Sequence, residues 1–211
     1  MRTSLLIKGL LAATAAAVPL IGNAGSSVQT GAGALTATDQ VEFTITVPQV
    51  LYLRVGTGSA YTTGTLANNA AIDVITFSPT AGQLTGGAVA GTGGDLGTGT
   101  ETAAVLGNGG TILLGASTPG AMNDGAGDTI NWSQIGTASA TNTTTTALPA
   151  PVLANGASAN LTLNASSKSF YEDAKWTYTY TITAGSPPAA GTYGGATAAN
   201  DGIVTYTASM P

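Results

Sequence analysis

The chain has 211 residues, with 5 basic and 10 acidic side chains, no His and no Cys. Only 7% of the residues are charged and 43% are hydrophobic, so charge repulsion cannot keep the chain unfolded. The lack of His and Cys excludes His-based acid–base catalysis, thiol catalysis and ordinary zinc sites. With 30 Gly and 9 Pro, the composition predicts a folded, turn-rich, all-β protein with a thin core.

Residues 1–24 are typical of a signal peptide. Arg2 and Lys8 supply the basic start, residues 9–21 are apolar and Ala-rich, and Ala24 ends the segment with a small side chain. The apolar stretch is shorter than the roughly 20 residues of a membrane-spanning helix, although an uncleaved anchor is the alternative. We therefore expect export to the periplasm, the cell surface or the extracellular space, with no membrane span after cleavage.

Cleavage after Ala24 removes Arg2 and Lys8 and leaves 3 basic against 10 acidic side chains, a net charge of −7. So few cations cannot neutralise a phosphate backbone, which argues against nucleic acid as a partner. An exported chain without Cys also has no disulfide framework, so sheet area and packing must stabilise the fold.

The N-terminal part of the mature chain divides into an arm and the start of the domain. Residues 25–40 are small and mostly polar, and we expect them to form a flexible or extended arm. Residues 41–47 alternate apolar and polar side chains, which predicts a half-buried strand that opens the folded domain. The same alternation continues over 51–55, and Pro48 predicts a bend that passes the chain from one ladder to another.

The middle of the chain gives weaker signals. Short segments rich in residues that favour strands predict strands at 72–77, 111–114, 129–135 and 159–165. Residues 80–110 are mostly Gly, Thr and Ala, and predict variable loops with one weak strand at most. The Thr run 143–146 is expected to be a solvated connection.

The C-terminal third carries the clearest alternation. Aromatic and β-branched side chains alternate with Thr over 176–183, and a second alternating run covers 204–210. The first run is expected to point its apolar side chains into the core, namely Trp176, Tyr178, Tyr180 and Ile182. Residues 41–211 are thus predicted to form a single antiparallel β-sandwich, Ig-like or pilin-like, of about 7 to 9 strands.

Three places contain residue types that could bind a ligand or react. Asp124 and Asp128 lie in a Gly-rich loop whose oxygen atoms suit Ca²⁺, although Asn, Asp and Gly are also ordinary turn formers. Glu172 and Asp173 would point to opposite faces of a strand rather than form a glycosidase pair, so we interpret them as a charged turn. We predict no cofactor and no enzymatic activity.

The third place is the aromatic row, which has two interpretations. If it is buried, Trp176, Tyr178 and Tyr180 supply the apolar area that an Ala-rich core lacks. If it lies on an open sheet face, the same rings could stack on sugars and make the chain a carbohydrate-binding module.

The layout resembles exported β-sandwich surface proteins of Gram-negative bacteria, namely pilin-like subunits and spore-coat-protein-U-like domains. The resemblance rests on the signal peptide, the small polar arm, the 41–47 strand, the Gly-rich middle and the terminal strand 202–211. We expect a secreted or cell-surface structural protein, a non-enzymatic subunit of a filament, coat or extracellular matrix. The alternative is a carbohydrate-binding or adhesive module.

The expected partners are copies of the same chain or other surface proteins, joined by strand addition. The arm 25–40 carries no charge before Asp39, and could lie along a neighbour's sheet edge with Val28 and Leu35 as its anchors.

Overall fold

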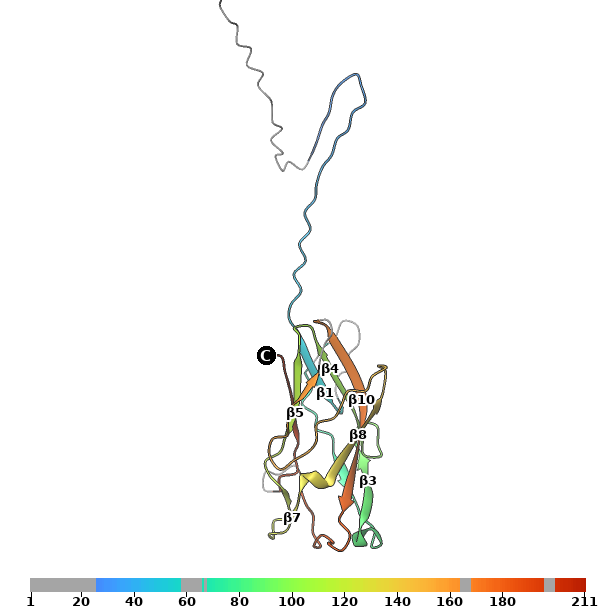
Figure 1. The fold of residues 1–211 in the computed structure, drawn as a ribbon, viewed down its shortest axis with the longest axis vertical. Helices are drawn as coiled ribbons and strands as arrows, with labels where there is room; N and C mark the ends of the chain where they lie inside the picture. The colour runs from blue at the N-terminus through green and yellow to red at the C-terminus, as the bar shows by residue number, and fades with distance from the viewer. Residues whose placement is uncertain (1–25, 58–65, 67, 164–167, 196–199) are drawn as a thin grey trace, which may run out of the picture. The chain divides into compact units, whose positions relative to one another are not determined.

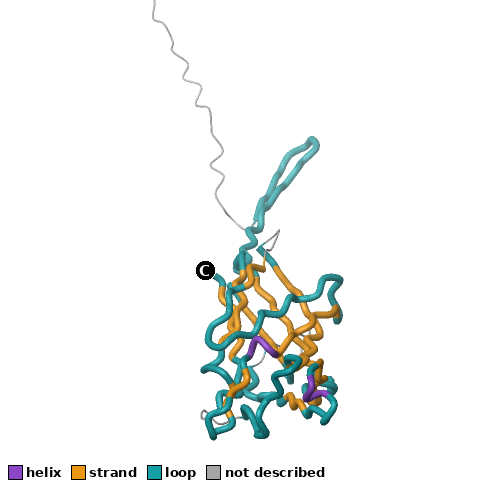
Figure 2. The backbone as a smooth tube through the Cα atoms, turned by 60° about the horizontal axis from the view of Figure 1, so that its bottom comes forward, coloured by secondary structure: helices purple, strands orange, loops and turns teal. Residues whose placement is uncertain are grey.

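The fold was analysed in a computed structural model that describes residues 26–57, 66, 68–163, 168–195 and 200–211. The predicted signal peptide, 1–24, lies outside the described residues. Within them the chain is all-β, apart from two short 3-10 turns at Gln83–Thr85 and Trp132–Gln134 (Figure 2). No helix in this described part is long and apolar enough to cross a membrane.

The segment 41–47 does not form the predicted strand. It has no ladder partner, and the exposed fractions of its apolar side chains are 75% for Val41, 85% for Phe43, 86% for Ile45 and 72% for Val47. The chain divides into two compact units between Val47 and Pro48, seven residues later than the predicted domain start. Pro48 therefore does not pass the chain between two ladders, because only the segment after it is paired.

The larger sheet has six strands, with β10 at its centre. They are β1 (Leu51–Val55), β2 (Ile75–Phe77), β3 (Gly87–Gly93), β4 (Thr100–Gly107), β8 (Ile135–Thr141) and β10 (Phe170–Ile182). Along one edge of β10, β4 and then β3 pair with it, and β8 pairs along the other edge (Figure 1). Beyond them, β1 pairs with β4 and β2 with β3, so β1, β2 and β8 are the terminal strands.

Two smaller sheets complete the described fold. In one, β5 (Ile112–Ser117) lies between β9 (Leu161–Leu163) and β11 (Thr205–Ser209). The other pairs β6 (Met122–Asn123) with β7 (Thr129–Ile130). All these ladders are antiparallel, and one hydrophobic cluster contains buried side chains from both larger sheets.

The region 80–110, predicted to be variable loops, supplies two strands of the larger sheet. β4 is buried along nearly its whole length, with β1 on one edge and β10 on the other. A strand covered on both faces needs no apolar–polar alternation, so the Ala- and Thr-rich sequence of β4 does not indicate a strand. The turn before β4 depends on glycine, since Gly99 has φ 69° and a Cβ there would lie 2.6 Å from the Cα of Gly91.

The predicted strand at 129–135 is also divided. β7 ends at Ile130, the 3-10 turn Trp132–Gln134 follows, and Ile135 begins β8, which the sequence did not predict. Asn131 and Gln134 form a capping box on this turn, so local side-chain hydrogen bonds favour the turn over a continuous strand.

Candidate functional site

The aromatic row of β10 lies in the core, as predicted. The exposed fraction is 0% for Trp176, 6% for Tyr178 and 4% for Tyr180. The indole Nε1 of Trp176 donates to the carbonyl oxygen of Leu148 at 2.9 Å, and the hydroxyls of Tyr178 and Tyr206 are 2.9 Å apart. These rings have no open face on which a sugar could stack, so a carbohydrate site would need other residues.

The loop that contains Asp124 and Asp128 is organised by its own backbone. Oδ1 of Asp124 accepts the backbone N–H groups of Ala126, Gly127 and Asp128 at 2.8, 3.1 and 3.0 Å. These hydrogen bonds lower the pKa of the Asp124 carboxyl, and the one from Ala126 contributes most. The arrangement is that of a turn-forming Asp, and no trio of acidic side chains in the described residues is placed to hold a metal ion.

The predicted charged turn at Glu172 and Asp173 does not form. Both residues lie within β10. Asp173 is buried, and its carboxylate accepts the backbone N–H groups of Thr143 and Thr144 at 2.9 and 2.8 Å, together with both their hydroxyls. Burial alone would raise the pKa of Asp173, but these hydrogen bonds outweigh it and hold the pKa well below its usual range. The Thr run 143–146 is a connection with Thr143, Thr145 and Thr146 exposed, as predicted, but Thr143 and Thr144 also anchor it to the sheet.

A second buried acidic group was not predicted at all. Glu101 of β4 is 4% exposed, and a Cβ at Gly56 would collide with carboxylate oxygens of both Glu101 and Asp73. Burial, and next the neighbouring Asp73 carboxylate, raise the pKa of Glu101 to about 7. The backbone N–H of Asp95 donates to Oε2 of Glu101, with 3.5 Å between the nitrogen and the oxygen. Asp73 lies before β2, and its carboxylate also accepts the backbone N–H of Thr57, which follows Gly56. No sequence spacing links Asp73 with Glu101.

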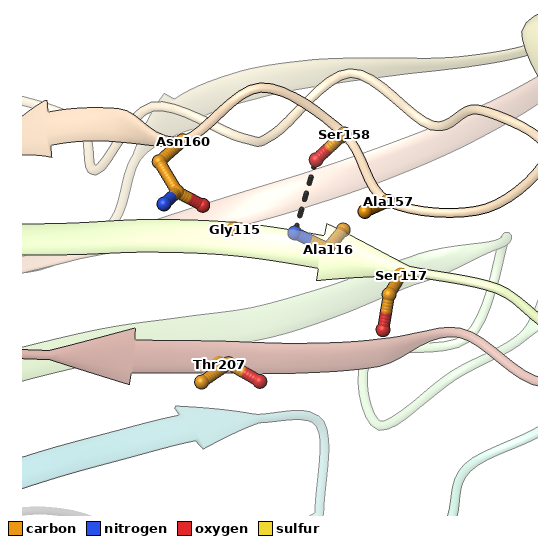
Figure 3. Close-up of a pocket in the computed structure, with 7 residues that line it drawn as sticks. All are labelled: Gly115, Ala116, Ser117, Ala157, Ser158, Asn160 and Thr207. Carbon is orange, nitrogen blue, oxygen red and sulfur yellow. Dashed lines mark hydrogen bonds between the residues drawn. The ribbon is translucent and has the colours of Figure 1, made fainter.

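A shallow pocket lies on the sheet that contains β5 and β11 (Figure 3). It is lined by Gly115, Ala116, Ser117, Ala157, Ser158, Asn160 and Thr207. The Ser158 hydroxyl accepts the backbone N–H of Ala116 at 3.0 Å, and a Cβ at Gly115 would collide with the Asn160 side chain. The lining contains no ionisable side chain, so the pocket offers no acid–base chemistry.

The most unusual surface feature is the apolar face of 41–47. Its four apolar side chains recur at every second position and are all exposed. Elsewhere in the described residues, large exposed apolar side chains occur singly or as the pair Ile72 and Val74. Sustained alternation is typical of a strand with one covered face, so this segment has the pattern of a strand without its cover.

Comparisons with protein-family models, with curated proteins and with solved structures find no match to the chain. The functional argument therefore depends on the residues themselves. Of the sites above, the buried rings and carboxyl groups belong to the folded domain, whereas the apolar side chains of 41–47 are exposed.

Proposed function

We propose that this chain is an exported, non-enzymatic structural subunit of a filament, coat or extracellular matrix, which joins other copies through the segment 41–47. The observation that carries the proposal is the exposed apolar face of this segment. A segment of this pattern gains a cover and backbone hydrogen bonds when it adds to the edge of another sheet.

The energy available from such an addition is large. Fully burying one Val, Ile or Phe side chain contributes roughly 1.5–3 kcal/mol, and the segment has four such side chains. Its three polar residues, Glu42, Thr44 and Thr46, alternate with them and would stay in solvent. The joining segment is thus 41–47 rather than 25–40, where only Val28 and Leu35 could act as anchors.

Two further features support a surface structural subunit. The signal-peptide pattern of 1–24 favours export to the periplasm, the cell surface or the extracellular space. The two larger sheets contribute apolar side chains to one core, which favours a β-sandwich as the body of the subunit. Burial of the aromatic row removes the residues on which the carbohydrate-binding alternative depended.

Sedimentation velocity of the exported chain tests the proposal. The chain should associate as its concentration rises, and the double change Phe43→Ser with Ile45→Ser should weaken association by about a hundredfold or more, because two apolar contacts are lost. The matched control, Val28→Ser with Leu35→Ser, removes two apolar side chains from the arm outside the segment and should leave association unchanged.

Two outcomes would overturn the proposal. One is a native chain that stays monomeric at its highest soluble concentration. The other is a double variant at Phe43 and Ile45 that associates as strongly as the native chain.

A further inference from the structure

We infer that the carboxyl groups of Asp73 and Glu101 form a pH-sensitive switch, in which one shared proton holds residues 69–73 against the start of β4 and loss of that proton releases them. Asp73 lies two residues before β2, and Glu101 is the second residue of β4. A side-chain hydrogen bond joins the two groups, with the Glu101 carboxyl as donor and the Asp73 carboxylate as acceptor. These two side chains are called the carboxyl pair below.

The carboxyl pair is the link between the sheet and the residues that lead into β2. Asp73 also accepts the backbone N–H of Thr57, and the Asn69 side-chain amide donates to the Thr57 carbonyl oxygen at 3.3 Å. The Ala71 N–H donates to Oδ1 of Asn69 at 2.8 Å. All three of these bonds lie within the connection between β1 and β2, so they order it without attaching it to β4.

The next attachment along the chain lies at the start of the β2–β3 ladder. There the Gly94 N–H donates to the Val74 carbonyl oxygen at 3.1 Å, and β2 then pairs with β3. Opening of the carboxyl pair therefore ends before Val74 and leaves the ladders of the larger sheet intact. Ile72, which is 74% exposed and adjacent to Asp73, moves with the released residues.

The surroundings of Glu101 explain why the proton is shared. The Glu101 carboxyl is enclosed by backbone, because a Cβ at Gly94 would lie 3.2 Å from its Oε1 and a Cβ at Gly56 would collide with its Oε2. This burial, and next the Asp73 carboxylate, raise the pKa of Glu101 to about 7. Burial would also raise the pKa of Asp73, but its hydrogen bonds outweigh burial and lower it. Below about pH 7 the proton therefore stays on Glu101.

The other groups that face Glu101 do not neutralise a second negative charge. From the turn between β3 and β4, the Asp95 N–H donates to Glu101, but the Asp95 carboxylate adds a further negative charge nearby. Tyr178 of β10 and Tyr206 of β11 face Glu101 with their hydroxyls, which are 2.9 Å apart. Burial foremost raises the pKa of both hydroxyls, so they are neutral at about pH 7.

The basic side chains of the described strands lie on the opposite face of the sheet. Glu101 is on the core face, since Ala103, two residues further along β4, belongs to the core. Arg54 of β1 alternates with side chains that pack against the core, and Lys175 of β10 alternates with the buried Trp176. Neither cation is therefore placed to pair with an ionised Glu101.

Ionisation of Glu101 consequently breaks the link. Its proton passes to solvent, the hydrogen-bond donor is lost, and two carboxylates in contact repel each other. Glu101 is held in β4, which is paired along both edges, whereas Asp73 is only partly buried and lies outside the strands. Asp73 is therefore the partner that moves, together with the residues that precede it.

Two-dimensional NMR of the ¹⁵N-labelled exported chain in dilute solution tests the switch between about pH 5.5 and about pH 8.5. The amide signals of Thr57, Ala71 and Asp73 should shift together with one midpoint near pH 7. Above the midpoint their order parameters should fall from about 0.85 towards 0.6 or less, while those of β4 and β10 stay near 0.85.

Three variants assign the transition. Glu101→Gln supplies a side-chain N–H to Asp73 at every pH, so the transition should disappear and the order should persist at about pH 8. The matched control, Glu172→Gln in the half-buried part of β10, should leave the midpoint unchanged. Asp73→Asn removes the neighbouring charge and should move the midpoint to lower pH.

Three results would overturn the switch. They are amides at Thr57, Ala71 and Asp73 that do not change over this pH range, a transition that persists in Glu101→Gln, and a loss of order that spreads equally to β4 and β10. If Glu101→Gln fails to fold, the Asp73→Asn variant decides, and an unchanged midpoint there would contradict the carboxyl pair.

Discussion

Two regions of the molecule share one sequence pattern and differ completely in burial. The segment 41–47 and the second half of β10, 176–182, both alternate large apolar residues with mostly Thr at the polar positions. In 176–182 the large apolar side chains are at most 6% exposed, whereas in 41–47 they are at least 72% exposed. β10 has strands paired along both edges and a core beneath it, while 41–47 has neither.

This difference shows what alternation can and cannot predict. A period of two specifies which side chains share a face, and therefore that the segment is suited to a strand with one covered face. It does not specify which surface provides the cover. For β10 the cover is the chain's own core, and for 41–47 we propose that a second copy supplies it.

The largest expected effect on the free energy of unfolding comes from removing the buried ring of Trp176 in β10. Trp176→Ala should lower the free energy of unfolding by about 3–5 kcal/mol, because it leaves a cavity in the core. Urea denaturation of the monomer measures this change. The matched Phe43→Ala change in the exposed segment should alter monomer stability by less than about 0.5 kcal/mol. Equal effects of the two changes would show that the regions do not differ in cover.

A smaller loss is expected when the anchor of the Thr run is changed. Asp173→Asn removes a charge that accepts backbone N–H groups of Thr143 and Thr144, so we expect a destabilisation of about 2–4 kcal/mol. Glu172→Gln, at the adjacent and less buried position of β10, should have little effect on the denaturation midpoint. If Glu172→Gln destabilised the protein as much, the buried Asp173 network would not be the anchor.

The smallest of the three effects concerns Glu101. Its pKa of about 7 in the folded chain lies above the ordinary value of a Glu near 4.3, so the folded state holds the proton more tightly. Glu101 therefore contributes stability that is complete at about pH 4 and is lost as the pH rises through about 7. Glu101→Gln should consequently be more stable than the native chain at about pH 8, by as much as about 2–3 kcal/mol, and close to it at about pH 4.5.

Thermal melting across this pH range provides the measurement, with Glu42→Gln in the exposed segment as the control. Glu42→Gln should leave the pH dependence of monomer stability unchanged. A native chain whose stability rises from pH 5 to pH 8, with Glu101→Gln parallel to it, would contradict the raised pKa.

The all-β class and the strands with a clear apolar face could be predicted from the sequence. β1 and β11 follow the predicted alternation closely, and β10 follows it but begins earlier, at Phe170. β4 and β8 could not be predicted, because one is covered on both faces and the other is mostly small and exposed, so neither alternates.

The contacts of the buried carboxyl groups could not be predicted from the sequence, for a different reason. Asp173 meets Thr143 and Thr144 from 29 to 30 residues away, and Glu101 meets Asp73 from 28 residues away, with no motif that marks either contact. Such contacts follow from strand register, which local composition does not specify. The alternation in 41–47 is visible in the sequence, but the strand that it predicts does not form, and its apolar side chains are exposed.

Amide hydrogen exchange of the segment 41–47, followed as a function of protein concentration, tests the central claim most directly. If a second copy covers the segment, its amides should exchange at the rate of an open chain in dilute solution and become protected as the chain associates, while the amides of 26–40 stay unprotected. Exchange in 41–47 that remains fast in the associated protein, or protection that is already complete in the monomer, would contradict the account.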